Sequence, residues 1–146
     1  MSTFKILKYP DKNLRKIAKP VKKINKKIKK IIHKMFNTMY LYNGIGLAAT
    51  QVNINLQIIV IGIIKPLRNP LILINPKIIN KKKIIMSEEG CLSVPKKFFQ
   101  VPRYNYLKLY SLNHDGKKNI ISAQSNLSFC IQHELDHLKG KLILDY

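Results

Sequence analysis

The chain has 146 residues, which suits one ordinary domain with a single core, and we expect residues 1–146 to form one domain. Its start lacks a secretion signal and its longest apolar run, residues 58–64, is far shorter than the roughly 20 residues that cross a bilayer, so we expect a cytoplasmic protein without a membrane partner. The net charge is +20, but all except three of the 27 basic residues are lysine and Ile and Asn are also abundant, so we interpret the charge as compositional and expect no specific nucleic-acid partner.

The first predicted element is a helix over residues 21–40, where apolar side chains recur at helical spacing and lysines occupy the opposite face. A basic amphipathic helix can also lie on a membrane, but the apolar face of this one is suited to covering a domain core. The segment from Asn43 to Gly46 then ends the helix. Residues 47–51 are expected to form a short connection, and the two glycines before it let the backbone approach a ligand.

The rest of the chain is predicted to form strands followed by one helix. Apolar and β-branched runs interrupted by prolines predict strands over residues 57–64, 71–75, 77–85, 104–112 and 118–123. The last two flank the hairpin signal of residues 114–116. The final helix is predicted over residues 125–139, with Ser125 as its N-cap and Gly140 just past its end. This order predicts an α+β fold in which mainly antiparallel sheets pack around the C-terminal helix, together with an N-terminal helix.

The motif His133-Glu-Leu-Asp-His137 lies inside the final predicted helix. Four residues of α-helix turn slightly more than once, so both imidazoles project from one face and can bind one metal ion. Glu134 follows the first histidine directly, where its carboxylate can take a proton from a water molecule at the metal. The alternative is a surface helix with two incidental histidines. Because the chain has four histidines and three glutamates, a chance match to this motif is expected on the order of once in several hundred such sequences.

A catalytic metal site of this kind needs a third protein ligand. Proteases with a longer histidine motif place a third histidine where this chain has Ile143, and no glutamate follows Glu134. The third ligand must therefore lie upstream of His133.

Four upstream residues are candidates for this ligand: His33, His114, Cys130 and Cys91. Both histidines occupy positions typical of solvated surface. Cys130 lies about 10 Å along the helix from His137, so that it is better explained as a buried thiol. Cys91 follows a glycine in a separate segment and can reach the metal without distorting the helix.

Three segments together resemble the motifs of peptide deformylases in order and approximate spacing: Gly44-Ile-Gly-Leu-Ala-Ala-Thr-Gln51, Glu89-Gly-Cys-Leu-Ser93 and Gln132-His-Glu-Leu-Asp-His137. The resemblance extends over nearly the whole chain. It implies one peptide deformylase-like catalytic domain in which Cys91, His133 and His137 hold one divalent metal ion. It favours Fe(II), with Zn(II) or Ni(II) as alternatives that this mixed thiolate and imidazole set can also bind.

The resemblance also implies an activity and the residues that perform it. The activity is removal of the formyl group from the N-terminal formyl-methionine of newly synthesised polypeptides, by water that the metal and Glu134 activate. The side-chain amide of Gln51 and the backbone N–H of Leu92 would stabilise the oxyanion.

Substrate binding and partners follow from the same resemblance. Ile45, Gly46 and Gly90 would bind the substrate backbone as an added strand, with an apolar pocket for the methionine side chain. Residues 96–100 are bulkier and more basic than the family pattern, which leaves preference beyond the first residue open. Many bacterial members continue into a C-terminal helix implicated in ribosome docking, whereas this sequence ends at Tyr146. We expect a monomer that associates weakly with the ribosome through its lysine-rich surface.

Two other function classes share some of these sequence features with a deformylase. One is a different metallohydrolase, such as an endopeptidase, and the other is a basic nucleic-acid-binding protein with a structural metal. A structural site would want four protein ligands and no general base, whereas Glu134 beside His133 indicates a site open to water. Turnover of a formylated methionine peptide distinguishes the three classes.

Overall fold

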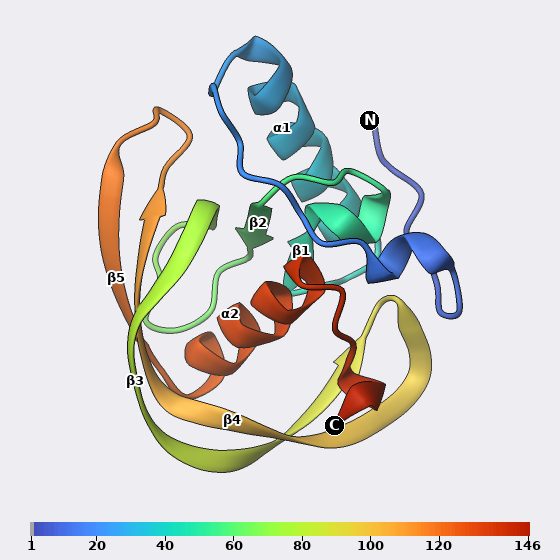
Figure 1. The fold of residues 1–146 in the computed structure, drawn as a ribbon, viewed down its shortest axis with the longest axis vertical. Helices are drawn as coiled ribbons and strands as arrows, with labels where there is room; N and C mark the ends of the chain where they lie inside the picture. Colours follow the sequence, from blue (N-terminus) through green and yellow to red (C-terminus); the bar gives the residue numbers. More distant parts are fainter. Residues whose placement is uncertain (1) are drawn as a thin grey trace.

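The fold is one antiparallel sheet combined with two α-helices and three short 3-10 turns (Figure 1). The computed structural model describes residues 2–146. The elements are η1 (Lys12–Arg15), α1 (Lys26–Leu41), β1 (Gly46–Ala48), η2 (Ala49–Val52), β2 (Ile58–Ile61), β3 (Leu71–Cys91), β4 (Val94–Leu112), β5 (Lys118–Gln124), α2 (Ser125–Leu138) and η3 (Ile143–Asp145). The five strands follow one another across the sheet in chain order, and every neighbouring pair is antiparallel. The predicted α+β class is confirmed.

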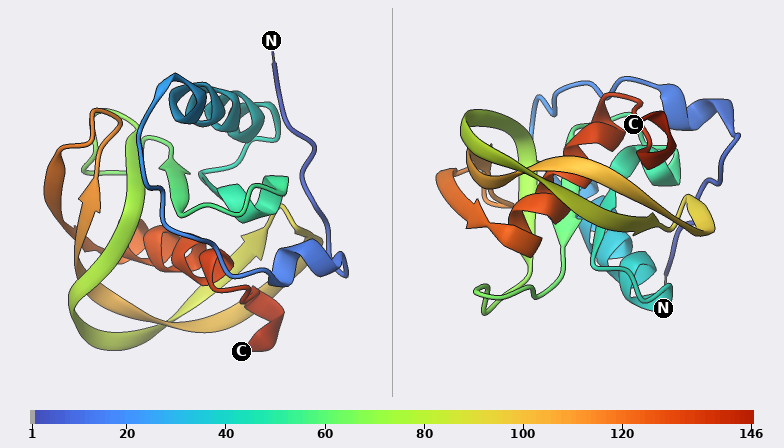
Figure 2. Two further views of the ribbon diagram at one scale, coloured as in Figure 1. Left: turned by 45° about the horizontal axis from the view of Figure 1, so that its top comes forward. Right: turned by 90° about the horizontal axis from the view of Figure 1, so that it is seen from below.

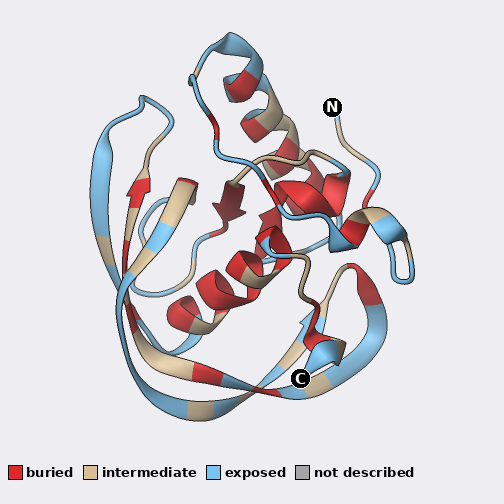
Figure 3. Cartoon of the chain, viewed as in Figure 1, coloured by how far each residue is buried: buried red, intermediate tan, exposed pale blue. Residues whose placement is uncertain are grey.

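Strand β2 lies in the middle of the core and is buried on both faces. Ile59 and Ile61 point into a cluster formed with α2, whereas Ile58 and Val60 point into a second cluster formed with α1. Because successive side chains of a strand alternate between the two faces, a strand between two helices must be apolar at every position. This explains the uninterrupted apolar run, and the burial pattern is visible in Figure 3.

Strands β3 and β4 form a long two-stranded ribbon that curves around α2 (Figure 2). Register shifts occur between Ile74 and Lys77, between Ile78 and Asn80, and between Glu89 and Cys91. Such irregularities bend a ribbon and increase its twist. The two strands predicted over residues 71–75 and 77–85 are one strand, because Pro76 falls within the first shift, where no ladder hydrogen bond is lost.

Helix α1 begins later than the predicted residue 21. Its N-cap is Asn25, whose side chain accepts a hydrogen bond from the Ile28 N–H at 3.0 Å, and Val21 instead donates its N–H to the Asn75 side chain. The buried face of α1 packs on the core, in agreement with the predicted stripe. None of the helices within residues 2–146 has the length and apolar character needed to cross a membrane.

Helix α2 covers the predicted range within one residue, but the expected cap is wrong. Ser125 is the first helical residue, with φ of 54°, and the N-cap is Gln124, which makes no side-chain capping bond. The Ser125 hydroxyl lies 3.4 Å from the Asn105 side chain instead. At the other end, Gly140 follows the C-cap Lys139 with φ of 74°, the left-handed conformation expected for a glycine just past a helix.

Candidate metal centre and active site

Helix α2 is buried around most of its circumference, yet it carries two histidines and a glutamate. Buried polar groups are costly unless they are paired, so their presence here points to a function. His133 and His137 lie one turn apart, and their Nε2 atoms face each other at 3.2 Å. The rings are set edge to face, with centroids 5.0 Å apart.

Cys91 is brought to these histidines by the end of β3. Its Sγ lies 3.3 Å from His137 Nε2, and one ligand atom from each of Cys91, His133 and His137 lies within 4.8 Å of the others. Tetrahedral bonds of about 2.0–2.3 Å place ligand atoms about 3.3–3.7 Å apart, so the spacing suits a single ion. Among residues 2–146 these three form the one such group of histidine, cysteine and acidic side chains.

The ionisation of the two histidines also fits a cation between them. Burial opposes the charge on His133, but contacts with Cys91 and Glu89 outweigh it and raise its pKa to about 10. Burial and the neighbouring His133 charge lower the pKa of His137. Two imidazolium ions cannot face each other at this distance, so the two rings carry one proton between them. A metal ion would bind both rings in their neutral form and displace that proton.

Glu134 lies beside this group with only 4% of its surface exposed. Its Oε2 has no hydrogen-bond partner among the described residues, and burial raises its pKa to about 7. A Cβ added at Gly46 would come within 3.0 Å of the Glu134 Oε1, so β1 packs directly against this carboxylate. A carboxylate with a free lone pair and a pKa near neutrality can both accept and return a proton.

The side-chain amide of Gln51 faces the same site. Gln51 lies in the 3-10 turn η2, whereas the sequence predicted a short connection without regular structure. Its Oε1 accepts a hydrogen bond from the Ala48 N–H at 2.9 Å, which orients the amide. Its Nε2 donates to Ser93 Oγ at 3.1 Å and lies 3.8 Å from Cys91 Sγ. Leu92 occupies the turn between β3 and β4, directly after the cysteine.

The three other ligand candidates do not reach this group. Cys130 is buried with its Sγ 4.0 Å from the carbonyl oxygen of Ile45, and burial raises the pKa of its thiol. His33 and His114 are exposed, on α1 and on the turn before β5.

Comparison with known proteins identifies the family that carries this arrangement. Residues 3–146 match the family model described as polypeptide deformylase. The chain belongs to the polypeptide deformylase family. The peptide deformylase of Buchnera aphidicola subsp. Acyrthosiphon pisum (strain Tuc7) is 60% identical over 146 residues, which cover 100% of this chain and 84% of that protein.

Solved structures agree with this membership. A crystal structure of a peptide deformylase from Legionella pneumophila has a TM-score of 0.95 and 40% identity, covering 99% of this chain and 85% of that one. The peptide deformylase of Ehrlichia chaffeensis in complex with actinonin has a TM-score of 0.96 and 37% identity, covering 100% and 89%. The chain is therefore a metal-dependent hydrolase that removes N-terminal formyl groups, as the sequence predicts.

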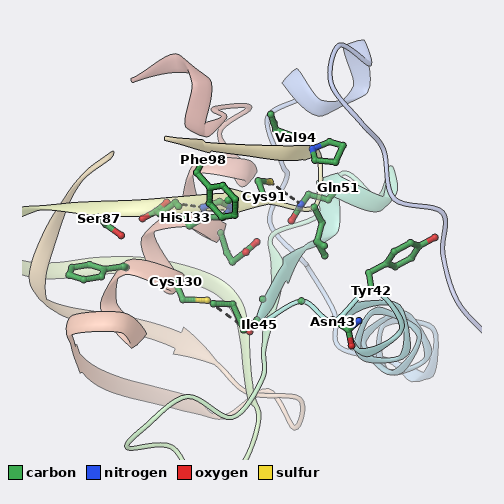
Figure 4. A pocket seen from close by; sticks show the side chains of 18 of the residues that line it. Tyr42, Asn43, Ile45, Gln51, Ser87, Cys91, Val94, Phe98, Cys130 and His133 are labelled. Carbon is green, nitrogen blue, oxygen red and sulfur yellow. Dashed lines mark hydrogen bonds and ion pairs between the residues drawn. The ribbon is translucent and has the colours of Figure 1, made fainter. Parts of the chain in front are cut away.

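A cavity of about 850 Å³ opens beside the deformylase motifs (Figure 4). Its walls include Ile45, which directly precedes β1, Gly46, the first residue of β1, and Gly90 near the end of β3. Phe98 of β4 lies over Gly90, since a Cβ added there would be 3.0 Å from the Phe98 ring. Ile45 and Phe98 remain 64% and 71% exposed, so the cavity has apolar flanks open to a ligand.

Arg103 also belongs to this deformylase site, although no sequence motif predicts it. Its Nε and Nη2 donate to the two carboxylate oxygens of Glu89 at 2.9 and 2.8 Å, and Glu89 Oε1 lies 2.9 Å from His133 Nδ1. A carboxylate behind a metal-binding histidine fixes the orientation of its ring. The available signal was compositional, because Arg103 is one of three arginines in a chain whose other basic residues are lysines.

Proposed function

We propose that Cys91, His133 and His137 hold one divalent metal ion, and that the loaded site removes the formyl group from the formyl-methionine N-termini of nascent polypeptides. The observation that carries this proposal is the convergence of one thiol and two imidazoles at 3.2–3.3 Å beside a buried carboxylate. The bound cation would supply Lewis acidity that polarises the formyl carbonyl and lowers the pKa of water.

Glu134 moves the proton in this scheme. It accepts a proton from the attacking water through the unpaired Oε2 and passes that proton to the departing amine. A pKa of about 7, which burial sets, leaves the carboxylate able to take part in both transfers.

Gln51 and Leu92 stabilise the negative charge that develops on the formyl oxygen. The Gln51 Nε2 is oriented before substrate arrives, because Ala48 and Ser93 hold the amide at both ends. The backbone N–H of Leu92 provides the second donor from the turn that follows Cys91. Loss of one such preorganised donor costs about 3 kcal/mol of barrier height.

Ile45, Gly46 and Gly90 bind the substrate chain. Strand β1 is the edge strand of the sheet, with β2 on one side, so its other edge can pair with an extended peptide. The cavity next to Ile45 takes the methionine side chain, which is apolar and flexible enough to fill it.

The resident ion in this proposal is Fe(II), held by one thiolate and two imidazoles, a set that Ni(II) and Zn(II) also fit. The enzyme acts as a monomeric, single catalytic domain of residues 1–146, in the cytoplasm where nascent chains emerge. Its net charge of +20 gives it weak, salt-sensitive contact with the ribosome.

The proposal is tested by measuring formate release from a formylated Met-Ala-Ser peptide with protein that is loaded with Fe(II), Ni(II) or Zn(II). Glu134→Gln should retain one metal ion and lose at least about 100-fold in turnover, the lower end of the roughly 100- to 10,000-fold range for general acid–base catalysis. Asp115→Asn, at an exposed hairpin tip, serves as the control acid and should behave as wild type. Absence of turnover in all three metal-loaded forms would contradict the proposal.

The iron assignment has its own test. An iron site with a thiolate ligand that is open to water is vulnerable to oxidation in air, so the Fe(II) form should lose activity within an assay in air and keep it without oxygen. The Ni(II) form should be stable under both conditions. Equal air stability of the two forms, or highest activity with Zn(II), would overturn Fe(II) and leave the ligand set unaffected.

A further inference from the structure

We infer that Tyr146 is a positioning residue for the metal centre, and that its hydroxyl, acting through Asp136, Arg103 and Glu89, fixes the orientation of His133. The inference rests on the proposed metal site, because His133 is one of its ligands. The Tyr146 hydroxyl does not contact His133 itself, because Arg103 and Glu89 lie between them.

The inner part of this chain of contacts is buried and fully connected. The His133 Nδ1 is 2.9 Å from Glu89 Oε1, and Glu89 is held by two hydrogen bonds from Arg103. The Arg103 side chain is 2% exposed and that of Glu89 is 9% exposed. A guanidinium that is this deeply buried can hold its partner rigidly only if its own remaining donors are fixed.

The outer part supplies that fixation through Arg103 Nη1. This nitrogen donates to Asp136 Oδ2 at 2.7 Å and to the Tyr146 hydroxyl at 3.2 Å. The same hydroxyl donates to Asp136 Oδ2 at 2.5 Å. Arg103, Asp136 and Tyr146 thus form a closed triangle, in which each of the three groups is held by the other two.

The ring of Tyr146 adds contacts that do not depend on its hydroxyl. The Arg103 guanidinium carbon lies 5.2 Å from the ring centroid, and the Lys141 Nζ lies 3.9 Å from it. A Tyr146→Phe change keeps both cation–π contacts and removes only the two hydrogen bonds. The variant therefore separates the orientation of Arg103 from the packing against it.

Without the hydroxyl, Asp136 and Arg103 Nη1 each lose one partner, and the guanidinium can shift toward Asp136. Its two bonds to Glu89 then weaken, and the His133 ring gains freedom to turn away from the metal. Loss of a group directly behind a metal ligand typically costs about 10- to 100-fold in affinity. Because Tyr146 does not touch His133 and acts through Arg103 and Glu89, with Asp136 bonded to both Tyr146 and Arg103, we expect metal release to be about three- to tenfold faster.

The experiment compares wild type, Tyr146→Phe and a control, Tyr40→Phe. Tyr40 is half exposed on α1 and stacks on Phe36, a contact that phenylalanine preserves. Zinc release into excess chelator gives the dissociation rate, and the visible spectrum of the Co(II)-loaded protein reports ligand geometry. Tyr146→Phe should release zinc about three- to tenfold faster and alter the Co(II) spectrum, whereas Tyr40→Phe should match wild type.

Asp136→Asn provides a second variant and a test of coupling. It should release zinc faster as well, and the double variant should be less affected than the sum of the two single changes because both act on Arg103. Wild-type release rate and an unchanged Co(II) spectrum in Tyr146→Phe would overturn the inference, even if the melting temperature fell. Wild-type protein that holds no metal would overturn the proposed site itself, and the inference with it.

Discussion

The two cysteines of this chain lie in different environments, which suit them to different roles. Cys91 is partly exposed at the end of β3, with His137 and the Gln51 amide within reach of its sulfur. Cys130 is buried among apolar side chains of α2 and the sheet, and burial raises the pKa of its thiol. Since the thiolate is the form that binds metals, these environments favour Cys91 as the ligand and Cys130 as a packing residue.

This contrast predicts the metal content of two matched variants. Cys91→Ala should lose stoichiometric metal binding, because two imidazoles alone leave the ion short of its third protein ligand. Cys130→Ala should keep one metal ion per chain and lose only some stability. Metal analysis after gel filtration measures both, and a Cys130→Ala protein without metal beside a metal-loaded Cys91→Ala protein would reverse the assignment.

A glycine at position 46 is required by the close approach of β1 to α2. An added methyl group would lie 3.0 Å from both Cys130 Sγ and Glu134 Oε1. Gly46→Ala should therefore displace the Glu134 carboxylate by a few tenths of an ångström and lower kcat by about tenfold or more, since small misplacements of catalytic groups are costly.

Gly62→Ala is the matched control for this change. Gly62 directly follows β2, and its new methyl group would meet the Cε of Met39 on α1 at 3.4 Å, an ordinary packing distance. Gly62→Ala should keep kcat near wild type in the same formate-release assay. Equal losses in the two variants would show that sheet distortion, rather than contact with Glu134, causes the effect.

Some parts of the site could be predicted from the sequence and others could not. The spacing of His133 and His137 predicts their shared helix face, because α-helical geometry fixes it. Arg103 could not be placed in this way. Its link to Glu89 depends on a bent ribbon that brings β4 across α2, and no local pattern encodes that contact.

At the scale of elements, the far end of the β3–β4 ribbon is a part of the fold that the sequence patterns do not predict. The predicted strands stopped at residue 85 on one side and began at residue 104 on the other, whereas the ribbon continues to Cys91 and starts at Val94. Beyond Ile85 the strand alternates between exposed and half-buried positions, many of them polar, so the apolar alternation that marks a strand is absent. This unpredicted stretch is the part that delivers Glu89 and Cys91 to α2.

The C-terminal end of α2 depends on a glycine in two separate ways. Gly140 adopts φ of 74°, and a Cβ there would collide with the backbone carbonyl of Arg15. The left-handed conformation alone costs a non-glycine residue about 1–2 kcal/mol. Gly140→Ala should therefore lower the free energy of unfolding by more than about 2 kcal/mol, as measured by urea denaturation.

Gly116→Ala separates the two causes. Gly116 has a similar φ of 79°, but a Cβ there would meet only Ile24 Cδ1, at 3.7 Å. It should show the conformational cost of about 1–2 kcal/mol without the collision. If both variants were destabilised equally, packing of Gly140 on Arg15 would have no energetic consequence.

At the scale of the whole molecule, the segment after α2 is bound to the beginning of the chain by Arg15. Its guanidinium makes two hydrogen bonds to the Asp145 carboxylate and one to the Gly140 carbonyl oxygen. Asp145 also accepts a hydrogen bond from the Leu142 N–H at 2.8 Å, which closes η3. This junction holds the turn that carries Tyr146 against Asp136, so the N-terminal segment supports the same network that reaches His133.

The junction should weaken in acid, in a way that Arg15→Met can reveal. The hydrogen bond from Arg15 lowers the pKa of Asp145 below its ordinary value of 3.8. A carboxylate with a lowered folded pKa contributes stability above its unfolded pKa and loses that contribution as the pH falls through the folded value. The stability difference between wild type and Arg15→Met should thus be constant above about pH 5 and should shrink below pH 3.8.

The magnitude of this difference is limited by solvent, because the Arg15 and Asp145 side chains are 41% and 26% exposed. Partly exposed pairs contribute at most about 1 kcal/mol, and the bond to the Gly140 carbonyl would leave a smaller remainder in acid. Urea denaturation at pH 6, 4 and 3 measures the difference. Arg68→Met, at an exposed position, is the control, because it would lose metal in acid to the same extent as wild type and so corrects for that effect. A difference that stays the same across this range would mean that Asp145 is not the partner through which Arg15 stabilises the fold.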